Sequence, residues 1–91
     1  MKRQKKIAKK FRALAHPARI RLIEELITKD CCVGELQKCL KLSQPNVSQH
    51  LRVLKDAGIL EGKRDKNRIC YRIKDDTIIQ MLQILIKGEE G

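Results

Sequence analysis

Aromatic residues are almost absent, with one Phe, one Tyr and no Trp in 91 residues. Proteins that bind single-stranded nucleic acid stack bases on aromatic side chains, so we exclude that class. Long apolar runs are also lacking. The longest run, residues 78–86, contains two glutamines, whereas a membrane span needs about 20 apolar residues. The basic start has no following apolar stretch, so we expect no export signal and a cytoplasmic protein.

Acidic residues are scarce, because 11 Asp and Glu face 21 Lys and Arg for a net charge of +10. Such an excess attracts a polyanion, either nucleic acid or an anionic membrane. The bases concentrate in residues 1–12 and 63–74. The apolar stripe of residues 1–12 is too narrow for a membrane-surface helix, so we expect no membrane. The N-terminal lysines either lie near DNA or solvate the first helix.

The length favours one domain over residues 1–91. A chain of this size buries only about 60 to 65% of its surface, so a surplus apolar face predicts a subunit contact. Apolar spacing predicts a basic helix over 1–15, a second from Pro17, a short third over 33–40 and a fourth from the N-cap Ser43 to Gly58. Each of these boundaries follows from local sequence.

After Gly58 the apolar period changes from 3.6 to 2. It predicts strands over 59–64 and 68–74, joined by a turn in which Asn67 suits a left-handed conformation. An apolar helix follows over 77–87. The predicted fold is mainly α (α+β), a winged helix-turn-helix with about five helices and one β-hairpin wing.

Three stretches carry a family resemblance: Leu14 to Leu26, Leu42 to Leu60 and Arg68 to Ile73. The second contains Ser-Gln-Pro-x-x-Ser-x-His-Leu followed by Leu-x-x-Ala-Gly. The chain resembles the ArsR/SmtB family of small dimeric transcriptional repressors. The resemblance implies a homodimer on an inverted-repeat operator in double-stranded DNA, held together by its first and last helices. The candidate dimer contacts are Ile7, Phe11, Leu14, Ile78, Leu82 and Leu85.

The predicted fourth helix has a polar face suited to reading bases. At about 100° per residue, Gln49 and Arg52 point away from the apolar stripe. Glutamine can bond adenine and arginine can bond guanine or phosphate in the major groove. The candidate DNA contacts are Gln44, Pro45, Asn46, Ser48, Gln49 and Arg52 on this helix, with Lys63, Arg64, Lys66 and Arg68 on the hairpin. The alternative is an ordinary solvated surface.

Nothing in the sequence indicates catalysis. The two histidines, His16 and His50, lie in an interhelical turn and beside the core stripe. Neither has a serine or carboxylate placed by sequence to form a nucleophile–base set. We therefore expect no enzyme activity.

The four cysteines, in a protein without an export signal, are expected to be thiols rather than disulfides. The segment Asp30 to Leu36 resembles the family's arsenic site, with Cys32 in the first cysteine position and Gly34 replacing the second. The family's zinc site is absent, because no histidine follows His50. Cys31 and Cys32 remain candidates for a thiophilic metal or metalloid, or for oxidation, either of which would release DNA.

The other two cysteines receive weaker assignments. Cys39 is expected in the core, and Cys70 has no partner indicated by sequence. Ordinary buried or incidental thiols are the alternative for Cys31 and Cys32. Three functions stay open: a repressor with a thiol switch, a repressor without an effector, and an architectural protein that coats DNA without sequence preference.

Overall fold

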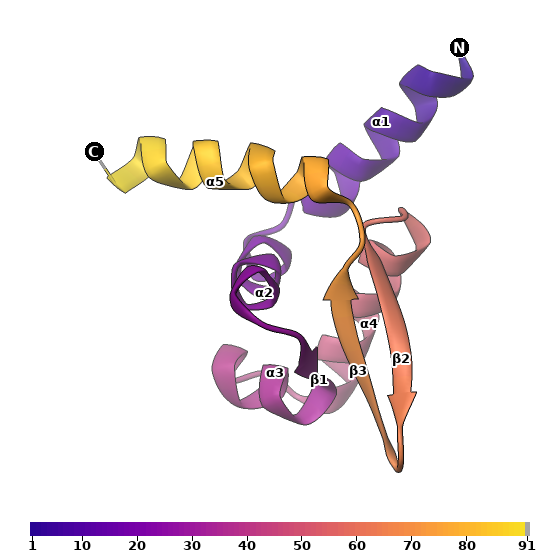
Figure 1. The fold of residues 1–91 in the computed structure, drawn as a ribbon, viewed down its shortest axis with the longest axis vertical. Coiled ribbons are helices and arrows are strands. Elements are labelled where there is room, and N and C mark those ends of the chain that lie inside the picture. The colour runs from indigo at the N-terminus through magenta and orange to yellow at the C-terminus, as the bar shows by residue number, and fades with distance from the viewer. Residues whose placement is uncertain (91) are drawn as a thin grey trace.

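The computed structural model describes residues 1–90, which form five α-helices and three β-strands. The helices are α1 (Lys2–Leu14), α2 (Pro17–Thr28), α3 (Val33–Leu40), α4 (Gln44–Asp56) and α5 (Asp76–Glu90). The strands are β1 (Cys31–Cys32), β2 (Leu60–Asp65) and β3 (Arg68–Ile73). Helices α1 and α5 lie at one end of the molecule, and the β2–β3 hairpin points to the other (Figure 1). The predicted architecture is confirmed.

Local capping explains where the central helices begin and end. The Nδ1 atom of His16 accepts a hydrogen bond from the backbone N–H of Ala18, 3.1 Å away, at the start of α2. The predicted cap of α4 is confirmed, since Ser43 Oγ accepts from the Asn46 N–H at 3.3 Å. Gly58 follows α4 with φ of +80°, a conformation that glycine adopts without steric cost.

The strands form one antiparallel sheet in the order β1-β3-β2. Asp65 pairs with Arg68, which leaves a two-residue turn. Lys66 takes the left-handed conformation there, with φ of 58°, so the prediction for Asn67 was wrong. In tight hairpin turns the first central residue carries the positive φ, and the register places Lys66 at that position. Strand β1 was not predicted, because two residues show no period.

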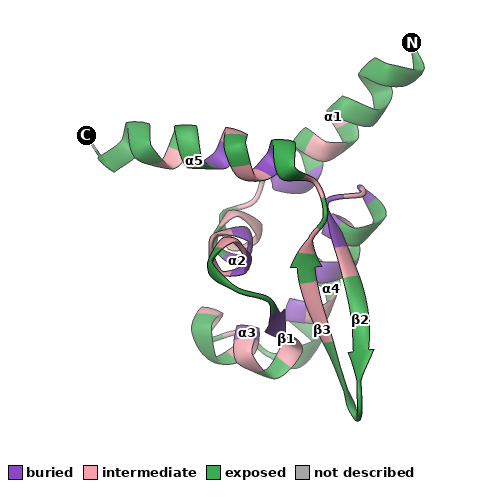
Figure 2. Cartoon of the chain, viewed as in Figure 1, coloured by how far each residue is buried: buried purple, intermediate pink, exposed green. Residues whose placement is uncertain are grey.

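One hydrophobic core joins α2, α3 and α4 to the base of the hairpin and to α5 (Figure 2). Leu14, Ile78 and Leu82 belong to it, with exposed fractions of 6, 5 and 4%. They are already buried within the chain and offer little surface to a second copy, so their role as dimer contacts stays a prediction. None of the helices in residues 1–90 is long and apolar enough to cross a membrane.

Candidate nucleic-acid interface

The polar face of α4 lies opposite its buried face. Val47, Leu51 and Leu54 are at most 1% exposed, so the core fixes the rotation of the helix. The predicted contacts on the other side are exposed, except for the half-buried Ser48. Gln44 Nε2 donates a hydrogen bond to Ser48 Oγ, 3.2 Å away, across one helical turn. The α4 face thus carries amide, hydroxyl and guanidinium groups on a rigid element.

A side-chain network ties α4 to the start of α2. Arg19 Nε donates to His50 Nδ1 at 3.2 Å, and Arg19 Nη1 donates to the Ala13 carbonyl at 3.4 Å. The rings of His16 and His50 lie 4.7 Å apart. Burial lowers the pKa of His50, and His16 and Arg19 lower it further, which keeps the ring neutral and able to accept. No local sequence pattern indicates the Arg19 contact, because 31 residues separate the partners.

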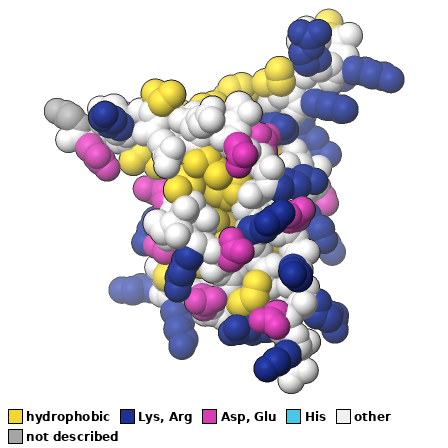
Figure 3. All heavy atoms as spheres, in the orientation of Figure 1, with side chains coloured by type: hydrophobic (Ala, Val, Ile, Leu, Met, Phe, Trp, Pro, Cys, Tyr) yellow, Lys and Arg dark blue, Asp and Glu magenta, His cyan; other side chains and the backbone are white. Residues whose placement is uncertain are grey.

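The hairpin is basic and open to solvent. Lys63, Arg64, Lys66 and Arg68 are all exposed, and Lys and Arg side chains line the end of the molecule where the hairpin lies (Figure 3). Arg68 Nη2 lies 3.8 Å from the Asp65 carboxylate. Exposed ion pairs of this kind contribute little to stability, so the cations stay available for phosphate.

A groove of about 590 Å³ runs between the starts of α3 and α4 and the hairpin. It brings together three predicted contacts, Gln44, Ser48 and Arg68. Asn67 and Lys38 also line it, although the sequence indicated only a turn for Asn67 and nothing for Lys38. Gln49 and Arg52 do not line this groove, and Lys63 and Arg64 line a separate pocket of about 340 Å³. The groove and the α4 face together offer donors to both phosphates and bases.

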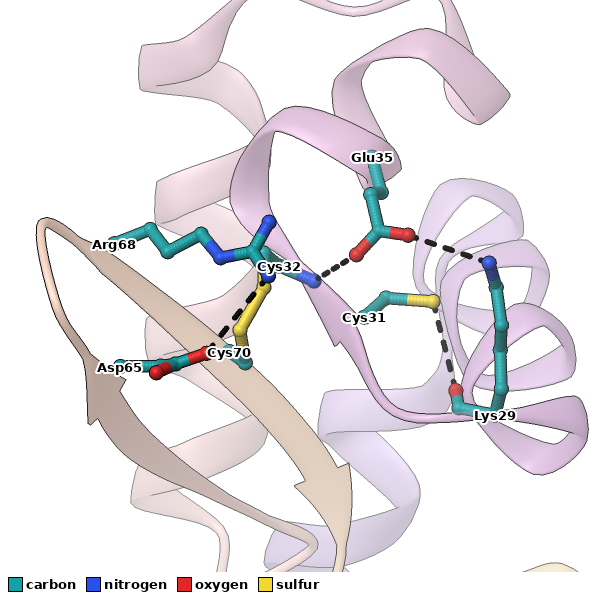
Figure 4. The surroundings of a disulfide bond; sticks show 7 residues. All are labelled: Lys29, Cys31, Cys32, Glu35, Asp65, Arg68 and Cys70. Atoms are coloured by element: carbon teal, nitrogen blue, oxygen red, sulfur yellow. Dashed lines mark hydrogen bonds and ion pairs between the residues drawn. A yellow bond between two sulfur atoms is a disulfide. The ribbon is translucent and has the colours of Figure 1, made fainter.

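Cysteine placement differs from the prediction. Cys32 and Cys70 form a disulfide, so the expectation of free thiols was wrong for this pair (Figure 4). The cause is the pairing of β1 with β3, which sets Cys32 opposite Cys70. Cys39 is exposed rather than in the core, because α3 turns Leu36 and Leu40 inward instead.

Cys31 is a buried thiol, 1% exposed, whose Sγ donates to the Lys29 carbonyl at 3.5 Å. Burial raises its pKa, and the nearby Glu35 carboxylate raises it further. Glu35 itself accepts a hydrogen bond from the Cys32 N–H at 2.9 Å and forms an ion pair with Lys29 at 3.2 Å. Both contacts lower the pKa of Glu35, the Cys32 N–H more strongly, so a carboxylate fixes the start of α3.

The cysteines do not fit a thiophilic metal. Trivalent arsenic favours three soft ligands, and the disulfide uses Cys32, which leaves Cys31 alone at the start of α3. Within residues 1–90 no group of three or more His, Cys, Asp or Glu side chains is placed to hold a metal ion. The metal form of the predicted thiol switch therefore finds no support in this geometry.

The family follows from comparison with known proteins. Residues 16–61, half of the chain, match the model described as "Bacterial regulatory protein, arsR family". The chain belongs to the arsR family. The biofilm growth-associated repressor of Agrobacterium fabrum is 38% identical over 84 residues, which cover 92% of this chain and 72% of the relative. The predicted resemblance is confirmed, and the protein is a transcriptional regulator of the arsR family.

Two solved structures share the fold. The crystal structure of Mycobacterium tuberculosis Rv0081 superposes with a TM-score of 0.84 at 40% identity, covering 96% of this chain and 88% of that one. A homodimeric winged helix-turn-helix DNA-binding domain of Mycobacterium bovis gives a TM-score of 0.88 at 21% identity, covering 96% and 81%. At that identity the second comparison shows the fold alone.

Proposed function

We propose that this arsR-family protein is a sequence-specific transcriptional repressor, which binds an inverted-repeat operator as a cytoplasmic homodimer. One observation carries the proposal: the exposed face of α4 presents amides, a hydroxyl and a guanidinium beside a basic hairpin. Exposed helix faces that serve only solubility are normally rich in Glu and Lys. A face of Asn, Gln and Ser instead suits hydrogen bonds to base edges.

The two parts of the interface take different roles. Gln49 and Asn46 make bidentate contacts to adenine in the major groove, and Arg52 reaches guanine or phosphate. Pro45 offers an apolar contact to a thymine methyl group. The hairpin cations contact the DNA backbone, which positions the protein without reading sequence.

A homodimer is supported by apolar residues left exposed on α1 and α5. Ile7, Phe11, Ile84 and Leu85 are 46, 55, 73 and 57% exposed. Exposed apolar patches of this kind mark interaction sites. Ile7 and Phe11 also line a cavity of about 260 Å³ between α1 and α5, where an apolar side chain of a second copy fits. The dimer then places two α4 helices about 34 to 36 Å apart, one turn of DNA.

Two rival functions remain distinguishable. An architectural protein would bind operator and random DNA with similar affinity, whereas a specific repressor binds its operator about 10³-fold or more tightly. A repressor without an effector would ignore thiol chemistry. Since a metal does not fit, we propose that thiol chemistry acts here through oxidation and reduction at Cys32.

The test is selection of an operator from random duplexes, followed by footprinting and sedimentation. We expect two protomers on an inverted repeat. Leu85→Glu places a charge in the dimer surface and should give monomers with much weaker operator binding. Gln83→Glu, an exposed change on the same helix, is the matched control and should leave the dimer intact. A monomer on a single asymmetric half-site would refute the proposal.

A further inference from the structure

The Cys32–Cys70 disulfide joins the two parts of the proposed interface. Cys32 is the N-cap of α3, the first helix of the helix-turn-helix, and Cys70 lies within the wing strand β3. Cys32 also lines the groove that contains Gln44 and Arg68. The bond therefore lies between the start of the helix-turn-helix and the basic hairpin.

The outer part of the hairpin has little packing against the helices. Residues 62–69 are all exposed, and β1 contributes only two residues to the sheet. Within the described chain, the core side chains of the hairpin lie at its base, at Leu60, Tyr71 and Ile73. A wing with little buried apolar surface opens at low free-energy cost when no covalent bond holds it.

We propose that Cys32 and Cys70 form a reversible redox pair, whose closed disulfide holds the wing in its DNA-binding position and whose reduction weakens operator binding. The inference rests on the proposed function and deepens it. The proposed effect of oxidation, which is tighter operator binding, is opposite to the sequence-based expectation that oxidation releases DNA.

The direction of this effect follows from the fold of the protein with the disulfide closed. That form superposes on the 40% identical Mycobacterium structure with a TM-score of 0.84, so the bond is compatible with the winged helix and does not distort it. A bond that restrains an already suitable geometry lowers the ordering cost of binding. We therefore expect the oxidised protein to bind its operator about three- to tenfold more tightly than the reduced protein.

The reaction partner is a small anionic disulfide compound. Cys70 is half-buried and lines the 340 Å³ pocket with three cations, Lys63, Arg64 and Arg72, and two carboxylates, Asp30 and Asp65. The pocket therefore keeps one net positive charge, which attracts an anion. The Cys70 thiolate attacks one reagent sulfur, forms a mixed disulfide and releases one reagent thiol. Cys32 then attacks the Cys70 sulfur and releases the second reagent thiol. Two electrons pass from the protein to the reagent, and the two cysteine protons end on the two released thiols.

The remaining cysteines are not part of this pair. Cys31 is buried, and its raised pKa keeps it protonated and unreactive. Cys39 is exposed, so it reacts with added reagents without forming the bond. A Cys39→Ser background removes this side reaction and serves as the reference protein.

The experiment measures operator affinity of Cys39→Ser by fluorescence anisotropy, after treatment with dithiothreitol or with glutathione disulfide. Mass spectrometry counts the hydrogens lost, and amide exchange over residues 62–70 follows the wing. We expect tighter binding and slower exchange in the oxidised sample. Addition of Cys70→Ser or, as a second variant, Cys32→Ser should abolish both responses.

Each result decides the matter. The proposal is overturned if the disulfide forms without tightening operator binding. It is also overturned if glutathione disulfide fails to form the Cys32–Cys70 bond. If neither redox state binds a selected operator, the repressor function fails. Redox-dependent exchange in residues 62–70 would still show that the bond holds the wing.

Discussion

Helix α4 and the hairpin wing are held in place by different forces. Helix α4 rests on three side chains that are at most 1% exposed, whereas residues 62–69 of the hairpin are exposed and carry only surface ion pairs. Base readout needs donors fixed to within a fraction of an ångström, and contact with phosphate tolerates more movement. The core therefore lies under α4, the helix that we propose reads the DNA sequence.

Core substitution gives the largest difference between these two regions. Leu51→Ala leaves a cavity beneath α4 and should lower the free energy of unfolding by about 2 to 5 kcal/mol. Ile69→Ala, at a hairpin position that is 40% exposed, should change it by about 0.5 kcal/mol or less. Urea unfolding of both variants measures the contrast. Similar losses would show that the hairpin is part of the core.

Base readout is the next largest effect. Gln49→Ala should weaken operator binding by about 1 to 3 kcal/mol and leave random DNA nearly unaffected, because only a base contact is lost. Gln83→Ala on α5 is the control and should change neither affinity. Equal losses on operator and random DNA would remove Gln49 from base readout.

The wing predicts a different signature. Lys66→Ala or Arg68→Ala should weaken binding to operator and random DNA alike, with a salt dependence shallower by about 1 in the log–log slope. Lys87→Ala, which removes one positive charge far from the wing, controls for net charge. A loss confined to the operator would instead assign base reading to the hairpin.

The smallest effect concerns the Arg19–His50 contact. Since the pKa of His50 is lowered in the folded protein, the unfolded chain takes up its proton at higher pH. The stability from neutral His50 is fully present above the ordinary histidine pKa of about 6.5 and is progressively lost as pH falls below it. Urea midpoints across this range should decrease for the wild type and change less for His50→Gln. If His50→Gln keeps the pH dependence of the wild type, the loss of stability at low pH does not come from His50.

Local signals predicted much of the fold. Ser43 caps α4 through its own side chain, and the Val47, Leu51 and Leu54 spacing alone sets which face is buried. The cysteine pairing needed information that no local pattern contains, because 38 residues separate Cys32 from Cys70. Strand β1, which aligns them, is too short to show a period. The Asn67 and Lys38 sides of the groove likewise exist only after the hairpin packs beside α3.

The most direct test of the division between α4 and the wing is interference mapping on a selected operator. Methylation of guanine N7 marks the major groove, and methylation of adenine N3 marks the minor groove. We predict that N7 methylation blocks binding in two regions about 34 to 36 Å apart. Gln49→Ala should alter that pattern, and Lys66→Ala should preserve it. Interference confined to adenine N3 and the phosphates would contradict major-groove reading by α4.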